Sequence, residues 1–109
     1  MLPKANRLVK KKDFQTVFKR GKNIKNHFLY FKVLKNNLKK SRFGFVVSKK
    51  VSSKANQRNK VKRRLRSVVL SNLKEVKEPV DVIIIASPGI VKKKFSDIQD
   101  TITKIFRDI

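Results

Sequence analysis

Hydrophobic positions along this chain follow two different periods, and the first of them is helical. From residue 11 to residue 20, Phe14, Val17 and Phe18 recur at a spacing that places their side chains on one face of a helix. Gly21 follows directly, as glycine often does where a helix ends. This pattern predicts a short amphipathic helix. The basic segment before it, residues 1–10, is expected to be flexible or loosely docked.

Between residues 22 and 47 the period changes to two, which is typical of strands. Strand-forming residues predict one strand over 27–34 and a second over 42–47, with a turn at Asn36 and Asn37 between them. We expect these two strands to pair as an antiparallel hairpin. A further short strand near residues 23–25 is also compatible with the pattern.

A helical pattern returns after the polar connector formed by residues 48–57. Asn56 is a suitable N-cap, so the sequence predicts a helix from about residue 57 to residue 74. When successive residues are placed about 100° apart, four apolar side chains of this helix fall in one stripe. They are Val61, Leu65, Val68 and Val69.

The pattern ends with a buried strand and an amphipathic helix. Residues 80–86 are almost continuously apolar, which is typical of a strand buried on both faces. From Phe95 onward apolar residues recur at helical spacing, and Ser96 with Gln99 forms a capping box at the start. The elements predict an α+β fold. We expect a single domain that spans residues 1–109, a two-layer sandwich of helices packed on a mixed sheet.

Charge changes this picture because it is concentrated in one part of the chain. The 109 residues carry a formal net charge of +23. Residues 1–74 contain 24 Lys and Arg but a single acid, Asp13, whereas residues 75–109 contain six of each sign. A compact domain with this charge repels itself, so the predicted partner is a polyanion, foremost nucleic acid. The neutral third is predicted to be mainly scaffold.

Basic residues are densest on the predicted helix over 57–74. Six of the nine positions from Arg58 to Arg66 are Lys or Arg, and several of them lie opposite the apolar stripe. A solvated surface is the ordinary explanation of a charge run. Such a surface normally mixes signs for i,i+4 pairing, however, and no acid occurs between Asp13 and Glu75. The helix is therefore predicted to bind nucleic acid.

The aromatic residues leave two interpretations open. Most aromatic side chains in a small domain belong to its core. Aromatic residues interleaved with cations on a sheet can also stack the bases of single-stranded nucleic acid. The pattern does not decide which way Phe28 and Tyr30 face.

Other chemistries find little support in the sequence. The absence of Cys excludes disulfides and thiolate zinc sites, and His27 is the only histidine. The acids show no spacing that suggests a metal site, and no apolar run is long enough to span a membrane. We expect no catalytic residue and no metal bound by this chain, no membrane contact, and a cytoplasmic location.

Four blocks of residues follow one another in an order that points to a known family. They are Arg7-Leu8, residues 13–22 with Asp13 and Phe14, residues 42–51 with Ser48-Lys49-Lys50, and the basic residues 58–66. This succession resembles the bacterial ribonuclease P protein component over nearly the whole chain. The family's arginine–asparagine–arginine motif has Lys60 at its third position here, which keeps the charge but lacks the bidentate fork of arginine.

The resemblance implies the protein subunit of a ribonucleoprotein endonuclease. This subunit joins a larger catalytic RNA, one protein per RNA, and assists removal of the 5′ leader from precursor tRNA. Catalysis and the required Mg²⁺ are expected on the RNA subunit. The implied fold is α-β-β-β-α-β-α with a left-handed β-α-β crossover, where general handedness rules favour a right-handed one.

The resemblance also implies two RNA-facing surfaces. The basic helix and the loop before it are expected to bind the RNA subunit, through Arg58, Asn59, Lys60, Lys62, Arg63, Arg66, Lys49 and Lys50. The cleft between the first helix and the sheet is expected to hold the leader, through Phe14, Phe18, Phe31, Arg7 and Lys11.

Two alternatives to this function are a structural RNA-binding protein of the ribosomal type and a nuclease that acts alone through isolated Asp residues.

Overall fold

The computed structural model describes residues 2–26 and 28–109, so His27 lies outside the described residues. The expected α+β fold is confirmed, with three α-helices and a four-stranded mixed sheet among the described residues. Three short 3₁₀ helices, η1, η2 and η3, connect these elements. In chain order the elements are η1 (Lys4–Asn6), α1 (Lys11–Arg20), β1 (Lys22–Lys25), β2 (Leu29–Lys35), β3 (Arg42–Val46), α2 (Ala55–Ser71), η2 (Leu73–Glu75), β4 (Val80–Ala86), η3 (Pro88–Lys92) and α3 (Phe95–Asp108).

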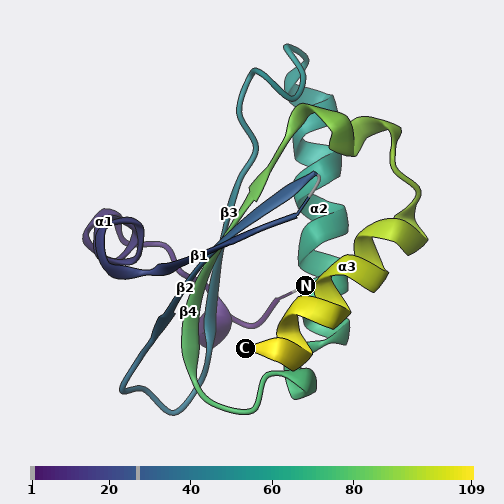
Figure 1. Ribbon diagram of the computed structural model, residues 1–109. Coiled ribbons are helices and arrows are strands. Elements are labelled where there is room, and N and C mark those ends of the chain that lie inside the picture. Colours follow the sequence, from purple (N-terminus) through teal and green to yellow (C-terminus); the bar gives the residue numbers. More distant parts are fainter. Residues whose placement is uncertain (1, 27) are drawn as a thin grey trace.

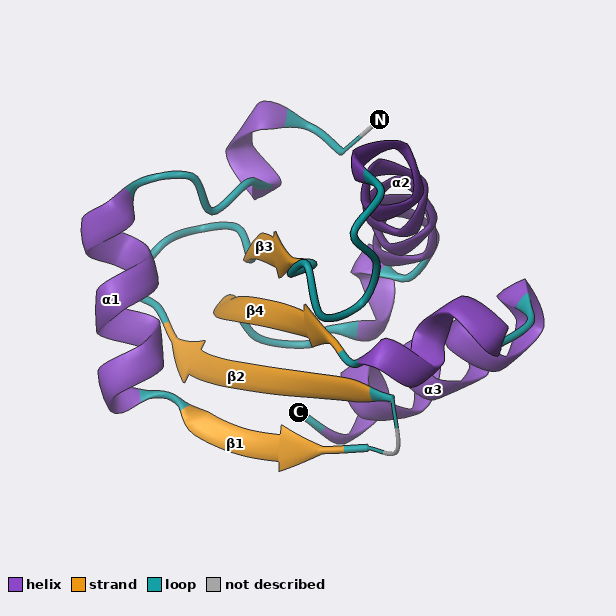
Figure 2. Cartoon of the chain, turned by 90° about the horizontal axis from the view of Figure 1, so that it is seen from above, coloured by secondary structure: helices purple, strands orange, loops and turns teal. Residues whose placement is uncertain are grey.

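The strands lie in the order β1-β2-β4-β3, and only β3 and β4 are parallel (Figure 2). The crossover from β3 through α2 to β4 is left-handed, as the two views of the chain show (Figures 1 and 2). A right-handed crossover between the same strands would place α2 on the face of the sheet that α1 covers.

The predicted hairpin between the strands at 27–34 and 42–47 is wrong, because β4 lies between β2 and β3. Apart from Asp81, the side chains of β4 are apolar on both faces. The centre of the sheet suits such a strand, because it has neighbours on both edges and helices on both faces there. The antiparallel hairpin partner of β2 is instead the short β1, in which Lys25 stands opposite Tyr30.

Helices cover both faces of the sheet (Figure 1). The main core lies on the α2 and α3 side, where the rings of Phe43 and Phe106 stack with their centroids 5.4 Å apart. A smaller cluster on the α1 side joins Leu8, Val17 and Ile83. Because successive residues of a strand point to opposite faces, the sequence of each strand is divided between these two cores.

The first helix spans the predicted residues, and Gly21 ends it for a different reason than expected. Gly21 has φ −74°, so no left-handed turn requires a glycine there. A Cβ at this position would instead collide with the carbonyl oxygen of Val17, whose backbone accepts the Gly21 N–H at 2.7 Å. Close approach of the backbone therefore explains the glycine.

The start of α2 lies earlier than predicted, with Lys54 rather than Asn56 at the N-cap. The preceding loop is ordered by its own polar contacts. The Lys54 N–H donates to Ser52 Oγ at 3.2 Å, and the Arg58 guanidinium donates to the carbonyls of Ser52 and Ser53, each at 3.0 Å. These bonds fix the chain direction before Asn56, so the helix begins at Ala55.

The start of α3 also differs from the prediction. Lys94 is the N-cap, and its N–H donates to Asp97 Oδ2 at 3.3 Å, while the Asp97 N–H donates to the Lys94 carbonyl at 3.0 Å. Ser96 and Gln99 therefore do not form the capping box. An acidic side chain at this position is favourable because it faces the positive end of the helix dipole.

Residues 2–10 are packed against the sheet rather than loosely docked. Leu2 and Leu8 are buried, and the Leu8 N–H donates to the Phe43 carbonyl at 2.9 Å. The amide of Asn6 donates to the Ser41 carbonyl at 2.8 Å. The segment thus runs beside β3 and forms one wall of a cleft. None of the described helices has both the length and the apolar character needed to cross a membrane.

Candidate nucleic-acid interface

A cleft of about 340 Å³ opens between the N-terminal segment, α1, β3 and α2. Apolar and aromatic side chains form most of its wall, and two arginines contribute charge. Its lining residues are Leu2, Arg7, Leu8, Val9, Phe14, Phe43, Gly44, Phe45 and Arg66. Three of the elements that meet here are far apart in the sequence, so the cleft exists only in the folded chain.

Phe14 lies in this cleft because β3 has a glycine beneath it. Gly44 is buried, and a Cβ added there would fall on the Phe14 ring. The ring therefore lies against the backbone of β3, and the side chain is partly buried. Its neighbour Val17, on the same face of α1, is buried and fixes the helix on the sheet.

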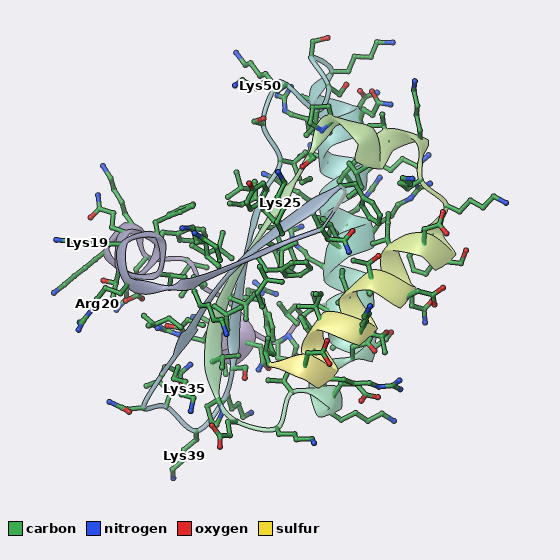
Figure 3. The ribbon with its side chains drawn as sticks, viewed as in Figure 1. Lys19, Arg20, Lys25, Lys35, Lys39 and Lys50 are labelled. Atoms are coloured by element: carbon green, nitrogen blue, oxygen red, sulfur yellow. The ribbon has the colours of Figure 1, made fainter. Side chains whose placement is uncertain are left out.

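Phe18 and Lys11 extend the same surface along α1. Phe18 lies one helical turn after Phe14 and is 42% exposed, so its ring is open to contact from solvent. Lys11 is exposed in the first turn of the helix. Farther along, Lys19 and Arg20 extend from α1 into solvent (Figure 3). The helix thus presents aromatic rings that are flanked by cations.

Arg66 of α2 also lines the cleft, so it does not lie only on the exposed surface of the basic helix. Its guanidinium lies 6.0 Å from the centroid of the Phe45 ring, at the cleft wall. Arg7 lies in the same wall, and its Nε donates to the Leu2 carbonyl at 2.8 Å. The two arginines bring positive charge to the aromatic cleft, and Arg66 connects the cleft with the basic helix.

The expected leader contact of Phe31 is wrong, because its side chain is 0% exposed and belongs to the main core. Its neighbour Tyr30 points to the α1 side and is 36% exposed, with the Lys25 ammonium 5.6 Å from its ring centroid. Phe28 is buried. The alternation along β2 shows that Tyr30 and Phe31 cannot share a face, but only the position of the helices shows which face is the core.

The basic surface of α2 is mostly free for a partner. Asn59, Lys60 and Arg63 are exposed, and Lys62 is partly buried. Lys49 and Lys50 are exposed in the turn before the helix, and Figure 3 shows Lys50 at the end of the molecule where α2 begins. Arg58 donates to two loop carbonyls, so it also holds this turn in place.

A network of side chains that sequence reasoning missed ties α1 to the sheet. Arg42 on β3 donates to both carboxylate oxygens of Asp81 on β4, at 2.9 and 2.6 Å, and to Asp13 on α1 at 3.2 Å. The amide of Asn36 donates to Asp81 at 2.8 Å. Hydrogen bonding to Asp81, with the charges of Asp81 and Asp13, raises the pKa of Arg42 although burial opposes the shift.

Asp13 therefore has a structural explanation. It is the single acid among the first 74 residues, and it neutralises a cation that holds the helix of Phe14 and Phe18. The sequence offered one clue to this role, the isolation of Asp13 among cations. A carboxylate is unfavourable on a surface that binds RNA unless it has a structural partner. Among the described residues, no group of three or more His, Cys, Asp or Glu side chains could hold a metal ion.

A basic helix beside an aromatic, arginine-lined cleft on an α+β scaffold defines a small nucleic-acid-binding protein. Residues 2–109 match the family model described as Ribonuclease P. The ribonuclease P protein component of Legionella pneumophila (strain Lens) is 39% identical over 107 residues, which cover 97% of this chain and 90% of the relative.

Solved structures agree with this match. The RNase P protein of Thermotoga maritima, in complex with 1-(4-fluorophenyl)-2-thiourea, has a TM-score of 0.85 at 30% identity and covers 94% of this chain and 99% of its own. The RNase P protein of Staphylococcus aureus has a TM-score of 0.85 at 28% identity, with 95% and 94% covered. The chain belongs to the ribonuclease P protein family. The resemblance predicted from the sequence is thereby confirmed.

Proposed function

We propose that this chain is the RNA-binding cofactor of a ribonuclease P whose catalysis, with its Mg²⁺, resides on the RNA subunit. The turn at Lys49 and Lys50 and the exposed face of α2 bind the RNA subunit, one protein per RNA. The cleft beside Phe14 holds the single-stranded 5′ leader of precursor tRNA, and the complex works in the cytoplasm. The observation that carries this proposal is the aromatic cleft bordered by Arg7 and Arg66 on a domain of net charge +23.

The chemistry of the cleft suits a single-stranded leader. Unpaired bases stack on aromatic rings, and a partly buried Phe14 with an exposed Phe18 supplies such rings along one helix face. Arg7 and Arg66 supply charge for the phosphates between the bases. A base-paired segment has its bases stacked already, so these contacts favour the leader over the mature tRNA.

The two carboxylates bound by Arg42 support a non-catalytic role for this chain. Asp13 and Asp81 both accept hydrogen bonds from Arg42. The Arg42 guanidinium occupies carboxylate oxygens that a catalytic base or a metal ligand would need free. This pairing argues against the alternative in which isolated Asp residues cut RNA without an RNA subunit.

Reconstitution tests the proposal. The purified chain is added to a bacterial ribonuclease P RNA at low Mg²⁺, and cleavage of precursor tRNA is followed. We expect the chain to stimulate cleavage, and we expect no cleavage by the chain with metal but without the RNA. No stimulation would refute the assignment, and robust cleavage by the chain alone would revive the nuclease alternative.

Leader dependence separates this function from that of a structural RNA-binding protein. In the reconstituted enzyme, Phe18→Ala should weaken binding of precursor tRNA about five-fold or more, the loss of one stacked base, and leave mature tRNA almost unchanged. Phe18 is exposed, so the substitution should spare the fold. Leu70→Ala, at an exposed apolar position on α2, is the matched control. Equal losses for precursor and mature tRNA would contradict a leader-binding cleft.

A further inference from the structure

The nearly neutral C-terminal third contains one unbalanced patch. Half of the six cations in residues 75–109 occur in succession, as Lys92, Lys93 and Lys94. All three are exposed, and none takes part in the ion pairs found among the described residues. A scaffold surface would normally pair such charges with nearby acids. The structure therefore does not explain these three adjacent lysines by pairing with carboxylates.

Two exposed apolar side chains border these lysines. Val91 is 37% exposed and Phe95 is 44% exposed. Phe95 lies one turn before Ile98, at the start of the apolar stripe of α3, whereas Ile98 and Ile102 are buried. The ring of Phe95 thus lies at the edge of the core with much of its surface available to a ligand.

The patch is held in place by the surrounding structure. Ile90 is buried and its carbonyl accepts the Lys93 N–H at 3.0 Å. The Lys93 ammonium lies 5.5 Å from the centroid of the buried Phe28 ring, and Lys94 is the N-cap of α3. The lysines and Phe95 therefore have a defined arrangement instead of belonging to a loose tail, which lowers the entropy cost of binding.

The patch lies away from the leader cleft. Figure 1 shows η3 at the end of the molecule where α2 begins, after which the chain descends to α3 on the side of the sheet opposite α1. The turn with Lys50 is at the same end (Figure 3). A large RNA bound to α2 and to that turn would need to extend over this end of the molecule to reach Lys92–94.

We propose that Lys92, Lys94 and Phe95 form a second RNA-binding site, which takes an unpaired nucleotide segment. The ammonium groups bind phosphates, and a base stacks on the Phe95 ring. The inference rests on the proposed function, and the position of the site near the start of α2 favours the RNA subunit as its source. Lys93 covers Phe28 and is assigned a structural role.

The test compares two double variants that remove the same charge from the same third of the chain. Lys92→Ala/Lys94→Ala removes the proposed contacts. Lys77→Ala/Lys104→Ala removes two exposed lysines from elsewhere and is the matched control. Affinity for a ribonuclease P RNA is measured over a range of salt concentrations. We expect the first variant to bind RNA more weakly and to make the negative slope of log K against log[salt] shallower by about one to two. The control should change neither the affinity nor the slope appreciably.

Phe95 is tested by two substitutions, Phe95→Ala and Phe95→Leu, because alanine could also disturb the start of α3. Phe95→Leu keeps an apolar side chain of similar bulk but removes the flat ring. Both variants should lose about five-fold or more in RNA affinity. Thermal unfolding followed by circular dichroism identifies any variant whose fold has changed. Wild-type affinity of a folded Phe95→Leu protein would overturn the stacking contact.

The source of the RNA is decided by a second measurement on the same variants. A loss in affinity for the RNA subunit alone supports the assignment, whereas a loss confined to precursor tRNA binding by the reconstituted enzyme places the site on the substrate. If Lys92→Ala/Lys94→Ala and its control have the same RNA affinity and salt dependence, the proposed second site is overturned. The proposed function still stands in that case, provided that the wild-type protein stimulates cleavage. A wild-type protein that does not stimulate cleavage refutes the proposed function itself.

Discussion

At the scale of single residues, the aromatic cleft depends on the missing side chain of Gly44. Phe14 lies over Gly44, and its ring fills the space that any other residue at position 44 would need. The aromatic surface of α1 and the glycine of β3 are therefore one feature, although 29 positions of sequence separate them. Neither residue alone shows this relation, because glycine in a strand has several possible explanations.

Gly44→Ala should displace the Phe14 ring and lower the free energy of unfolding by about 1–3 kcal/mol, as overpacking does. In the reconstituted enzyme it should also reduce the preference for precursor over mature tRNA. Gly89→Ala is the matched control, since a Cβ there meets no atom within 4 Å, and it should change stability by less than about 0.5 kcal/mol. Urea unfolding and tRNA binding measure the two effects. A Gly44→Ala protein with wild-type stability and discrimination would contradict this packing.

At the scale of elements, α1 is fixed to the sheet by charge as well as by apolar packing. Arg42 lies between Asp13 of α1 and the nearly buried Asp81 of β4. Removing either acid leaves Arg42 with one partner, but the consequences differ. Asp81 is deep in the structure, whereas Asp13 is partly exposed and contributes less to the stability of the fold.

Asp13→Asn should cost about 1 kcal/mol or less in stability and should weaken binding of the precursor-tRNA leader, because α1 then has more freedom to move. The substitution also raises the net positive charge, which by itself would strengthen RNA binding. A measured loss of leader affinity can therefore be assigned to position rather than to charge. Unchanged or stronger leader binding by Asp13→Asn would contradict the positioning role.

A second connection between elements joins η2 to α3. Arg107 donates to Glu75 at 3.1 Å, and this hydrogen bond lowers the pKa of Glu75 below its ordinary value. Because the folded pKa is lower than the unfolded one, the pair stabilises the fold fully above the unfolded pKa. This contribution disappears as the pH falls through the folded value.

The thermal midpoint of Glu75→Gln should therefore lie below that of the wild type at pH 7, and the difference should close below about pH 4. Glu78→Gln removes a carboxylate that pairs with the exposed Lys35 at 3.4 Å, and it serves as the control. Circular-dichroism melts between pH 7 and pH 3 measure the midpoints. A difference between Glu75→Gln and the wild type that does not vary with pH would show that this ion pair contributes nothing.

At the scale of the whole molecule, charge and stability oppose each other. A net charge of +23 on 109 residues favours RNA binding but destabilises the compact state through repulsion among like charges. Three of the seven acids form pairs that hold elements together, Asp13 and Asp81 with Arg42 and Glu75 with Arg107. We expect bound anions to relieve part of the remaining repulsion.

Sulfate should therefore stabilise the isolated protein at millimolar concentration, because an anion that binds the folded state shifts the folding equilibrium. The urea midpoint should rise with sulfate and approach a plateau, and chloride at the same ionic strength should have a smaller effect. Circular dichroism at matched ionic strength provides the measurement. Identical midpoints in the two salts would show that general screening, and not anion binding, accounts for the effect.

Much of this protein follows from its sequence alone. Periodicity placed α1, β2, β3, β4 and α3, because residues that bury one face must recur at the period of their element. The block of residues 48–66 pointed to the family, and the position of 24 cations before residue 75 predicts that this part of the chain carries the main RNA-binding surface. These properties are local or additive, so no three-dimensional information was needed.

The tertiary structure decided what depends on contacts between distant residues. It placed β4 between β2 and β3, where the local pattern predicts a hairpin of β2 and β3. A strand that is apolar on both faces is most stable inside the sheet, where both faces are covered. It put Phe31 in the core and Tyr30 on the surface, and it brought Arg66 to the cleft and Asp13 to Arg42. An alternating strand has two equivalent faces until a helix covers one of them, and the sequence pattern does not specify that choice.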